Sequence, residues 1–122
     1  MRCGGHRVVA RSLLWCRAMD KLAMLRSFCE KAPGDPFPRY GVAMELRRGG
    51  DLAGAVAAFA AMAKDFPDYV PQYLMAGQTL REMGDVPAAR AVLDAGIAVA
   101  TRVGNSHARG ELQSARDELD GL

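Results

Sequence analysis

The chain has 122 residues, half of them apolar, which is enough for the core of one small domain. No apolar run approaches the roughly eighteen residues of a membrane-spanning helix, so we expect a soluble protein that does not insert into a membrane. The net charge of +2 is unevenly distributed: residues 1–19 hold four arginines and no acid, whereas residues 20–122 carry twelve Lys/Arg against fourteen Asp/Glu. This balance excludes a basic nucleic-acid-binding surface over most of the chain.

Residues 1–18 are rich in arginine and do not share the pattern of the rest of the chain. Three interpretations stay open: a start site assigned too early, with Met19 as the true beginning; a disordered tail; or a targeting segment. Arg11 interrupts the apolar part and no clean cleavage site follows it, which speaks against a targeting role. We expect the folded unit to span residues 19–122, and a chain that begins at Met19 to fold as well as the full chain.

From Asp20 onward the pattern is helical, because alanine is abundant and aromatic residues make up only 7% of the chain. Asp20 is a suitable N-cap for a helix over residues 20–31. Four apolar side chains of this helix fall on one face: Leu22, Leu25, Phe28 and Cys29. The prolines of PGDPFP end it, and the next helix is expected over residues 38–48, with Pro38 in its first turn.

A third helix is expected over residues 52–65. Gly50 supplies the left-handed turn that ends the helix before it, and Asp51 caps the new one. Pro67 then stops this helix, since proline cannot continue the ladder of hydrogen bonds.

The same pattern recurs further along the chain. Pro71 opens a helix that Gly84 ends, and Asp85 caps the helix that follows. A polar break over residues 101–107 is expected to end that helix. A last helix over residues 106–120 then carries a thin apolar stripe of Leu112, Ala115 and Leu119, as a terminal capping helix should.

An internal repeat of 34 residues underlies this pattern. Seven identities occur at that offset: Leu46/Leu80, Arg47/Arg81, Gly50/Gly84, Asp51/Asp85, Ala55/Ala89, Ala57/Ala91 and Ala61/Ala95. They fall mostly at turn positions and at positions expected to be buried, which argues against chance.

These repeats resemble the tetratricopeptide family. Residues 36–69 carry its signature positions as Arg39, Val42, Ala43, Leu46, Ala55, Phe59 and Pro67, and residues 70–103 carry them as Tyr73, Ala76, Gly77, Leu80, Ala89 and Leu93. Three positions depart from the family pattern: Arg39 stands where an aromatic belongs, Thr101 where proline belongs, and Gly96 where alanine or a larger residue is usual. We expect these departures to leave the fold intact and to soften the end of the second repeat.

The resemblance implies an all-α fold of antiparallel helix-turn-helix repeats, stacked as a short right-handed solenoid. It comprises two full repeats, residues 36–69 and 70–103, with the helices over residues 20–31 and 106–120 covering the two ends. Small residues such as Ala43 and Gly77 are expected where helices cross closely, so that a larger side chain there should destabilise the protein.

No arrangement of residues indicates catalysis, so we expect a protein that is not an enzyme and that binds no cofactor and no metal. Asp51 and Asp85 each follow a helix-ending glycine and are explained as caps. The spacing of Cys3 and His6 is ligand-like, but no second pair accompanies them. Three widely spaced cysteines form no disulfide framework and favour the reducing cytoplasm.

In the resembled family the first helix of each repeat lines a groove that binds peptides or partner helices. Carried over to this chain, that geometry places eight residues in the groove: Phe37, Tyr40, Met44, Arg47, Leu74, Met75, Gln78 and Arg81. Clamping of a terminal carboxylate is not expected, because the first helices carry neither asparagine nor lysine. The two arginines could pair with acids of a partner or could simply be solvated.

The expected function is therefore that of a protein–protein interaction module or adaptor whose partner the sequence does not name. Two alternatives stay open. The chain could form a homodimer through apolar groove residues that remain exposed, namely Tyr40, Met44, Leu74 and Met75. It could also serve as a non-catalytic subunit of a larger complex.

Overall fold

The computed structural model describes residues 21–121, and all regular structure within that range is helical. The chain first forms a helix over residues 21–31, here called the N-terminal helix. Five helices follow it: α2 (Pro36–Arg48), α3 (Leu52–Asp65), α4 (Pro71–Glu82), α5 (Val86–Val103) and α6 (Ser106–Asp120). None of the helices in this range is long and apolar enough to cross a membrane.

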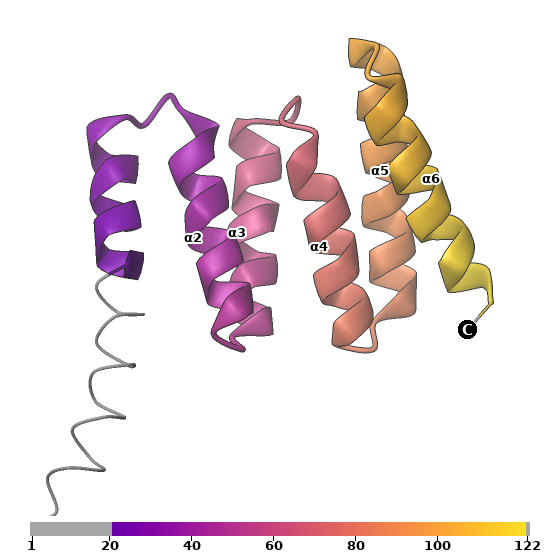
Figure 1. Cartoon of the computed structure of the whole chain (residues 1–122), viewed down its shortest axis with the longest axis horizontal. Helices are drawn as coiled ribbons and strands as arrows, with labels where there is room; N and C mark the ends of the chain where they lie inside the picture. Colours follow the sequence, from indigo (N-terminus) through magenta and orange to yellow (C-terminus); the bar gives the residue numbers. More distant parts are fainter. Residues whose placement is uncertain (1–20, 122) are drawn as a thin grey trace, which may run out of the picture.

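The helices are arranged in one row as a short solenoid (Figure 1). α2 packs against α3 and α4 against α5, so that each predicted repeat forms one helical hairpin, and α3 packs against α4 to join the two. α6 packs against both α5 and α4. In Figure 1, α2, α4 and α6 lie toward the viewer and α3 and α5 lie behind them.

The turns form as their sequences predict. The carboxylates of Asp51 and Asp85 accept hydrogen bonds from the backbone N–H three residues on, at 2.9 and 3.1 Å. Asn105 caps α6 in the same way, at 3.1 Å. Gly50 and Gly84, 34 residues apart, have φ values of +91° and +84°, a conformation that side-chain-bearing residues rarely adopt. The assignment of Asp51 and Asp85 as caps is confirmed.

Two helix boundaries differ from the prediction. α2 begins at Pro36 instead of Pro38, because the Asp35 carboxylate accepts the Phe37 N–H at 3.0 Å and a proline at the first helical position has no N–H to lose. α5 extends into the predicted polar break and ends at Val103. Thr101 stands where the family has proline, and because threonine keeps the backbone N–H that proline lacks, the helix can continue. The Thr101 hydroxyl donates a hydrogen bond to the Ile97 carbonyl at 2.8 Å.

The core consists of two neighbouring clusters. One lies between α2, α3 and α4 and comprises Ala43, Ala55, Phe59, Met62 and Ala76. The other lies between α4, α5 and α6 and includes Tyr73, Leu80, Ala89, Leu93, Leu112 and Leu119. The Tyr40 ring closes the first cluster against Phe59 and Tyr69, with ring centroids 6.2 and 5.5 Å away.

The departures from the family pattern have local explanations. Arg39 stacks over the Phe66 ring at 5.4 Å and pairs with Asp65 at 2.6 Å, so its side chain performs the packing expected of an aromatic. Gly96 is buried where α4 and α5 approach closely: a Cβ atom there would lie 2.5 Å from the Tyr73 Cβ. The glycine therefore lies at a tight helix crossing.

The N-terminal helix packs onto α2 at a second glycine. A Cβ atom on Gly41 would come within 3.0 Å of the Leu25 side chain, and Lys21 forms an ion pair with Glu45 at 3.5 Å. Leu22, Leu25 and Cys29 are partly buried as predicted, but Phe28 is 44% exposed. Phe28 lies at the margin of the packed face and not within it. Asp20 and residues 1–18 fall outside the described range.

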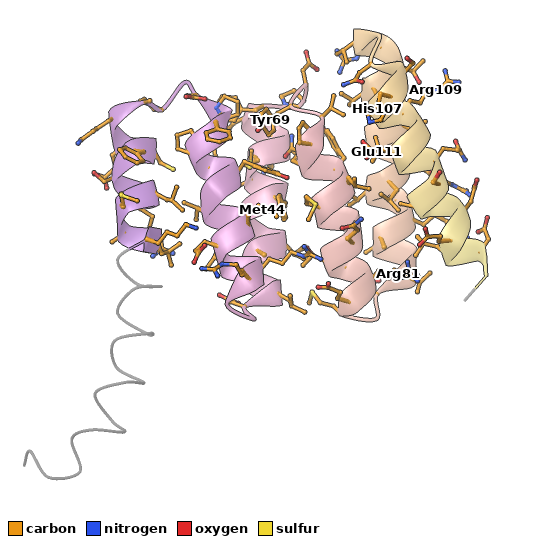
Figure 2. The ribbon with its side chains drawn as sticks, in the orientation of Figure 1. Met44, Tyr69, Arg81, His107, Arg109 and Glu111 are labelled. Atoms are coloured by element: carbon orange, nitrogen blue, oxygen red, sulfur yellow. The ribbon has the colours of Figure 1, made fainter. Side chains whose placement is uncertain are left out.

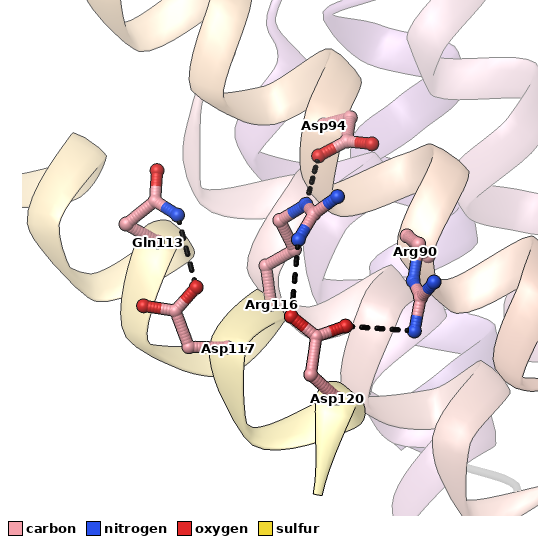
Figure 3. A network of polar contacts seen from close by, with 6 residues as sticks. All are labelled: Arg90, Asp94, Gln113, Arg116, Asp117 and Asp120. Atoms are coloured by element: carbon pink, nitrogen blue, oxygen red, sulfur yellow. Dashed lines mark hydrogen bonds and ion pairs between the residues drawn. The ribbon is translucent and has the colours of Figure 1, made fainter.

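At the other end, ion pairs fasten α6 to α5 (Figure 3). Arg116 of α6 pairs with Asp94 of α5 at 2.6 Å, and Arg90 of α5 pairs with Asp120 of α6 at 2.9 Å. Leu112 and Leu119 are buried beneath these contacts and Ala115 is partly buried, so the predicted apolar stripe of α6 is confirmed.

Candidate partner-binding site

The face formed by α2, α4 and α6, here called the first-helix face, carries three hollows. The N-terminal hollow lies between the N-terminal helix and α2. The central hollow lies among α2, α4 and the beginning of α6, and the C-terminal hollow lies between α4 and α6. Leu74 and Glu111 line both the central and the C-terminal hollow, which therefore adjoin each other.

All eight residues predicted for the groove line these hollows. Phe37, Met44 and Arg47 line the N-terminal hollow. Tyr40, Leu74 and Met75 line the central one, and Leu74, Gln78 and Arg81 line the C-terminal one. The N-terminal and central hollows share no lining residue, but Tyr40 and Met44, which line one each, lie one helical turn apart on α2.

The sequence prediction missed the contribution of α6. His107, Glu111, Ser114 and Glu118 complete the walls of the central and C-terminal hollows. The order of the helices along the chain could have indicated this contribution. A helix that follows the second helix of a repeat takes the position of the next first helix, and α6 does so although no third repeat follows it in the sequence pattern.

The two repeated arginines already have partners within the chain. Arg47 of α2 pairs with Glu82 at the end of α4 at 2.7 Å, and Arg81 of α4 pairs with Glu118 of α6 at 2.8 Å. Each arginine thus links one first helix to the next. An acidic partner would have to displace these carboxylates, and replacing either arginine would disturb the contact between repeats as well as any binding.

Two further polar groups on this face are constrained by their surroundings. Glu45 pairs with Arg48 at 2.8 Å, and the hydrogen bond from that guanidinium holds the pKa of the carboxyl below its ordinary value. Burial of the ring raises the pKa of Tyr40 above its ordinary value, so its phenol is even harder to ionise than a free one.

Within residues 21–121, no group of three or more His, Cys, Asp or Glu side chains is placed to hold a metal ion. His107 lies 3.6 Å from Glu111 on the surface of α6, and Cys29 is a free thiol. Cys3 and His6 fall outside the described residues.

A sequence profile of the tetratricopeptide repeat matches residues 46–103. The chain is 32% identical to a tetratricopeptide repeat domain protein from Salinibacter ruber. The solution NMR structure of that protein gives a TM-score of 0.70 over 74% of this chain and 91% of that one, and its crystal structure gives 0.67 over 72% and 98%. No curated protein sequence matches the chain.

A more distant likeness extends over most of the chain. The crystal structure of PcrH in complex with the chaperone binding region of PopD gives a TM-score of 0.76, covering 95% of this chain and 88% of that one. At 11% identity, this likeness concerns the fold alone.

Proposed function

This chain belongs to the tetratricopeptide-repeat family, and from that membership we propose that it is a protein-binding module, not an enzyme, whose first-helix face holds a peptide or a helix of a partner protein. The observation that supports this most is the arrangement of the hollows. Three of them lie along one face, two of these share Leu74 and Glu111, and each is lined by side chains of at least one first helix.

The shape and chemistry of the hollows suit a segment that runs across several helices. The central hollow has a volume of about 240 Å³, below the roughly 300–1,000 Å³ of sites that enclose a drug-sized molecule. Such a hollow accepts one or two side chains of a longer segment. Met44 and Met75 provide flexible apolar surface that adapts to different shapes.

One further consideration supports a binding role. PcrH, which shares the fold, was solved in complex with the chaperone binding region of PopD.

The cysteines bear on where the protein acts. The chain has three of them, widely spaced, which is not the even-numbered pattern of a disulfide-bonded protein and fits a reducing compartment. On that ground we place the action of the protein in the cytoplasm.

A charge on the central hollow should weaken partner capture. In Met75→Glu, a carboxylate would be desolvated against any apolar side chain that enters, and we expect binding to weaken by roughly tenfold, about 1.4 kcal/mol. The measurement is affinity capture with the full chain as bait, read by mass spectrometry, followed by titration of each captured protein.

Ala91→Glu is the matched control for this experiment. Ala91 is exposed on α5 and borders a different hollow, lined by α3, α4 and α5. Partners that bind Ala91→Glu but not Met75→Glu, with circular dichroism unchanged in both, support the proposal. The opposite pattern would place the working surface over α3 and α5 instead.

Self-association is the second candidate, and the surface that favours it differs from the expected one. Tyr40, Met44, Leu74 and Met75 are only partly exposed, which leaves little apolar surface in the groove itself. Three of the five exposed large apolar side chains among the described residues, including the two most exposed, lie at the N-terminal end: Phe37 at 66%, Met24 at 51% and Phe28 at 44%.

We expect any dimer to form through this end, because exposed apolar surface of this kind marks contact surfaces. Sedimentation velocity at high micromolar concentration should then show dimer for the full chain and monomer for Phe28→Glu. Monomer in both cases eliminates the self-association alternative.

A further inference from the structure

We propose that the segment bound by the first-helix face carries a basic side chain next to an apolar anchor, and that Glu111 is the carboxylate that receives it. This inference rests on the proposed function and specifies the chemistry of the partner. It follows from the distribution of charged groups along the three hollows, most of which neutralise one another.

The positive groups of this face are all engaged. Lys21 and Arg48 both pair with Glu45, at 3.5 and 2.8 Å. Arg47 pairs with Glu82 and Arg81 with Glu118. Among the residues that line the three hollows, every lysine and arginine therefore has a carboxylate partner, and three of the four glutamates have a cationic one.

Glu111 is the exception within the described residues. Its only ion-pair neighbour is His107, 3.6 Å away and 88% exposed, an imidazole that is charged only when protonated. The Glu111 side chain is itself 54% exposed and lies on the α6 wall (Figure 2). The central and C-terminal hollows are lined by one arginine, Arg81, and two glutamates, Glu111 and Glu118, so the uncompensated charge around them is negative, which favours a cationic ligand group.

The position of Glu111 makes this charge useful for recognition. It lines both the central and the C-terminal hollow together with Leu74. The floor of the central hollow is apolar, with Val70, Pro71, Leu74 and Leu112 among its lining residues. A leucine, methionine or phenylalanine seated there would bring a lysine or arginine one helical turn away within reach of Glu111.

This distribution argues against an acidic partner segment. Arg81, the one arginine that lines the central or C-terminal hollow, is held by Glu118, so an incoming carboxylate gains no free cation there. A basic group gains an unpaired carboxylate and breaks no existing ion pair.

The test uses the immobilised full chain and a phage-displayed library of short random peptides. Retained peptides should combine apolar residues with Lys or Arg, and replacing their basic residue with glutamine should weaken binding in fluorescence anisotropy. Glu111→Gln should weaken the same peptides roughly threefold and Glu111→Lys roughly tenfold, since an exposed ion pair contributes modestly. Both losses should shrink at high salt.

Glu30→Gln is the matched control, because Glu30 is an exposed carboxylate that lines none of the three hollows. It should bind the peptides like the unchanged chain. Met75→Glu distinguishes a failure of the proposed function from a failure of the inference about Glu111. If Met75→Glu weakens binding and Glu111→Gln does not alter it, the face binds segments but the charge inference is wrong.

If Met75→Glu also leaves binding unchanged, the proposed function fails together with the inference. Selection of acidic peptides, or of no peptide at all, would equally overturn the assignment of Glu111 as a receptor for a basic side chain.

Discussion

Phe59→Ala should destabilise the protein by about 3–5 kcal/mol, the cost of truncating a fully buried aromatic and leaving a cavity behind. Phe59 is 2% exposed and lies in the core cluster shared by α2, α3 and α4, with the Tyr40 ring against it. Three of the other four buried members of its cluster are alanines, Ala43, Ala55 and Ala76, whose side chains cannot extend into the space. Urea denaturation followed by circular dichroism measures the change in the free energy of unfolding.

Phe37→Ala makes the same chemical change where the ring is 66% exposed. We expect it to alter the free energy of unfolding by no more than about 0.5 kcal/mol, as for most surface substitutions. Similar losses for Phe59→Ala and Phe37→Ala would contradict the assignment of Phe59 to the core.

Gly96→Leu should cost about 3 kcal/mol, because extra atoms would have to enter a tight helix crossing. A Cβ atom at this position would lie 2.5 Å from the Tyr73 Cβ and 3.0 Å from Leu112 Cδ2. The Tyr73 Cβ is attached directly to the backbone and cannot rotate away, so α4 and α5 would have to separate. A Cβ on Gly77 meets Leu93 Cδ2 at 2.6 Å, but a leucine side chain can turn aside, so we expect a smaller loss there.

Gly110→Ala is the comparison for Gly96→Leu, because Gly110 also lies within a helix but has open space around it. Nothing lies within 4 Å of a Cβ atom placed at Gly110, so the alanine should stabilise α6 by roughly 0.5–1 kcal/mol through its higher helix propensity. Thermal melts of the two variants should therefore shift in opposite directions. Should Gly96→Leu melt like the unchanged chain, the crossing of α4 and α5 is looser than described.

The sequence alone predicts the helical hairpins well, because their boundaries depend on local chemistry. Asp51, Asp85 and Asn105 cap helices through contacts with residues three positions away. The 34-residue spacing of Gly50 and Gly84 then indicates the repeat. The end of α5 was predicted wrongly for the same local reason: a polar stretch resembled a break, although it extends a helix already held by its core contacts.

Features that depend on distant contacts could not be predicted. Gly96 was interpreted as a weak point, and only the position of Tyr73 shows that it is a close crossing. The eight groove residues do line one set of hollows, because a helical repeat fixes which side each first helix presents. The ion pairs of the two groove arginines could not be inferred, because Glu82 and Glu118 lie 35 and 37 residues from the arginines that they bind.

The two ends of the described helices differ, and the difference limits how copies of the chain can assemble. The N-terminal end exposes Met24, Phe28 and Phe37, whereas α6 exposes no large apolar side chain and presents mainly charged and polar ones. Head-to-tail stacking would set the apolar N-terminal end against the charged and polar surface of α6. A contact between the apolar ends of two copies would instead be head to head, about a two-fold axis, and would close on itself at the dimer.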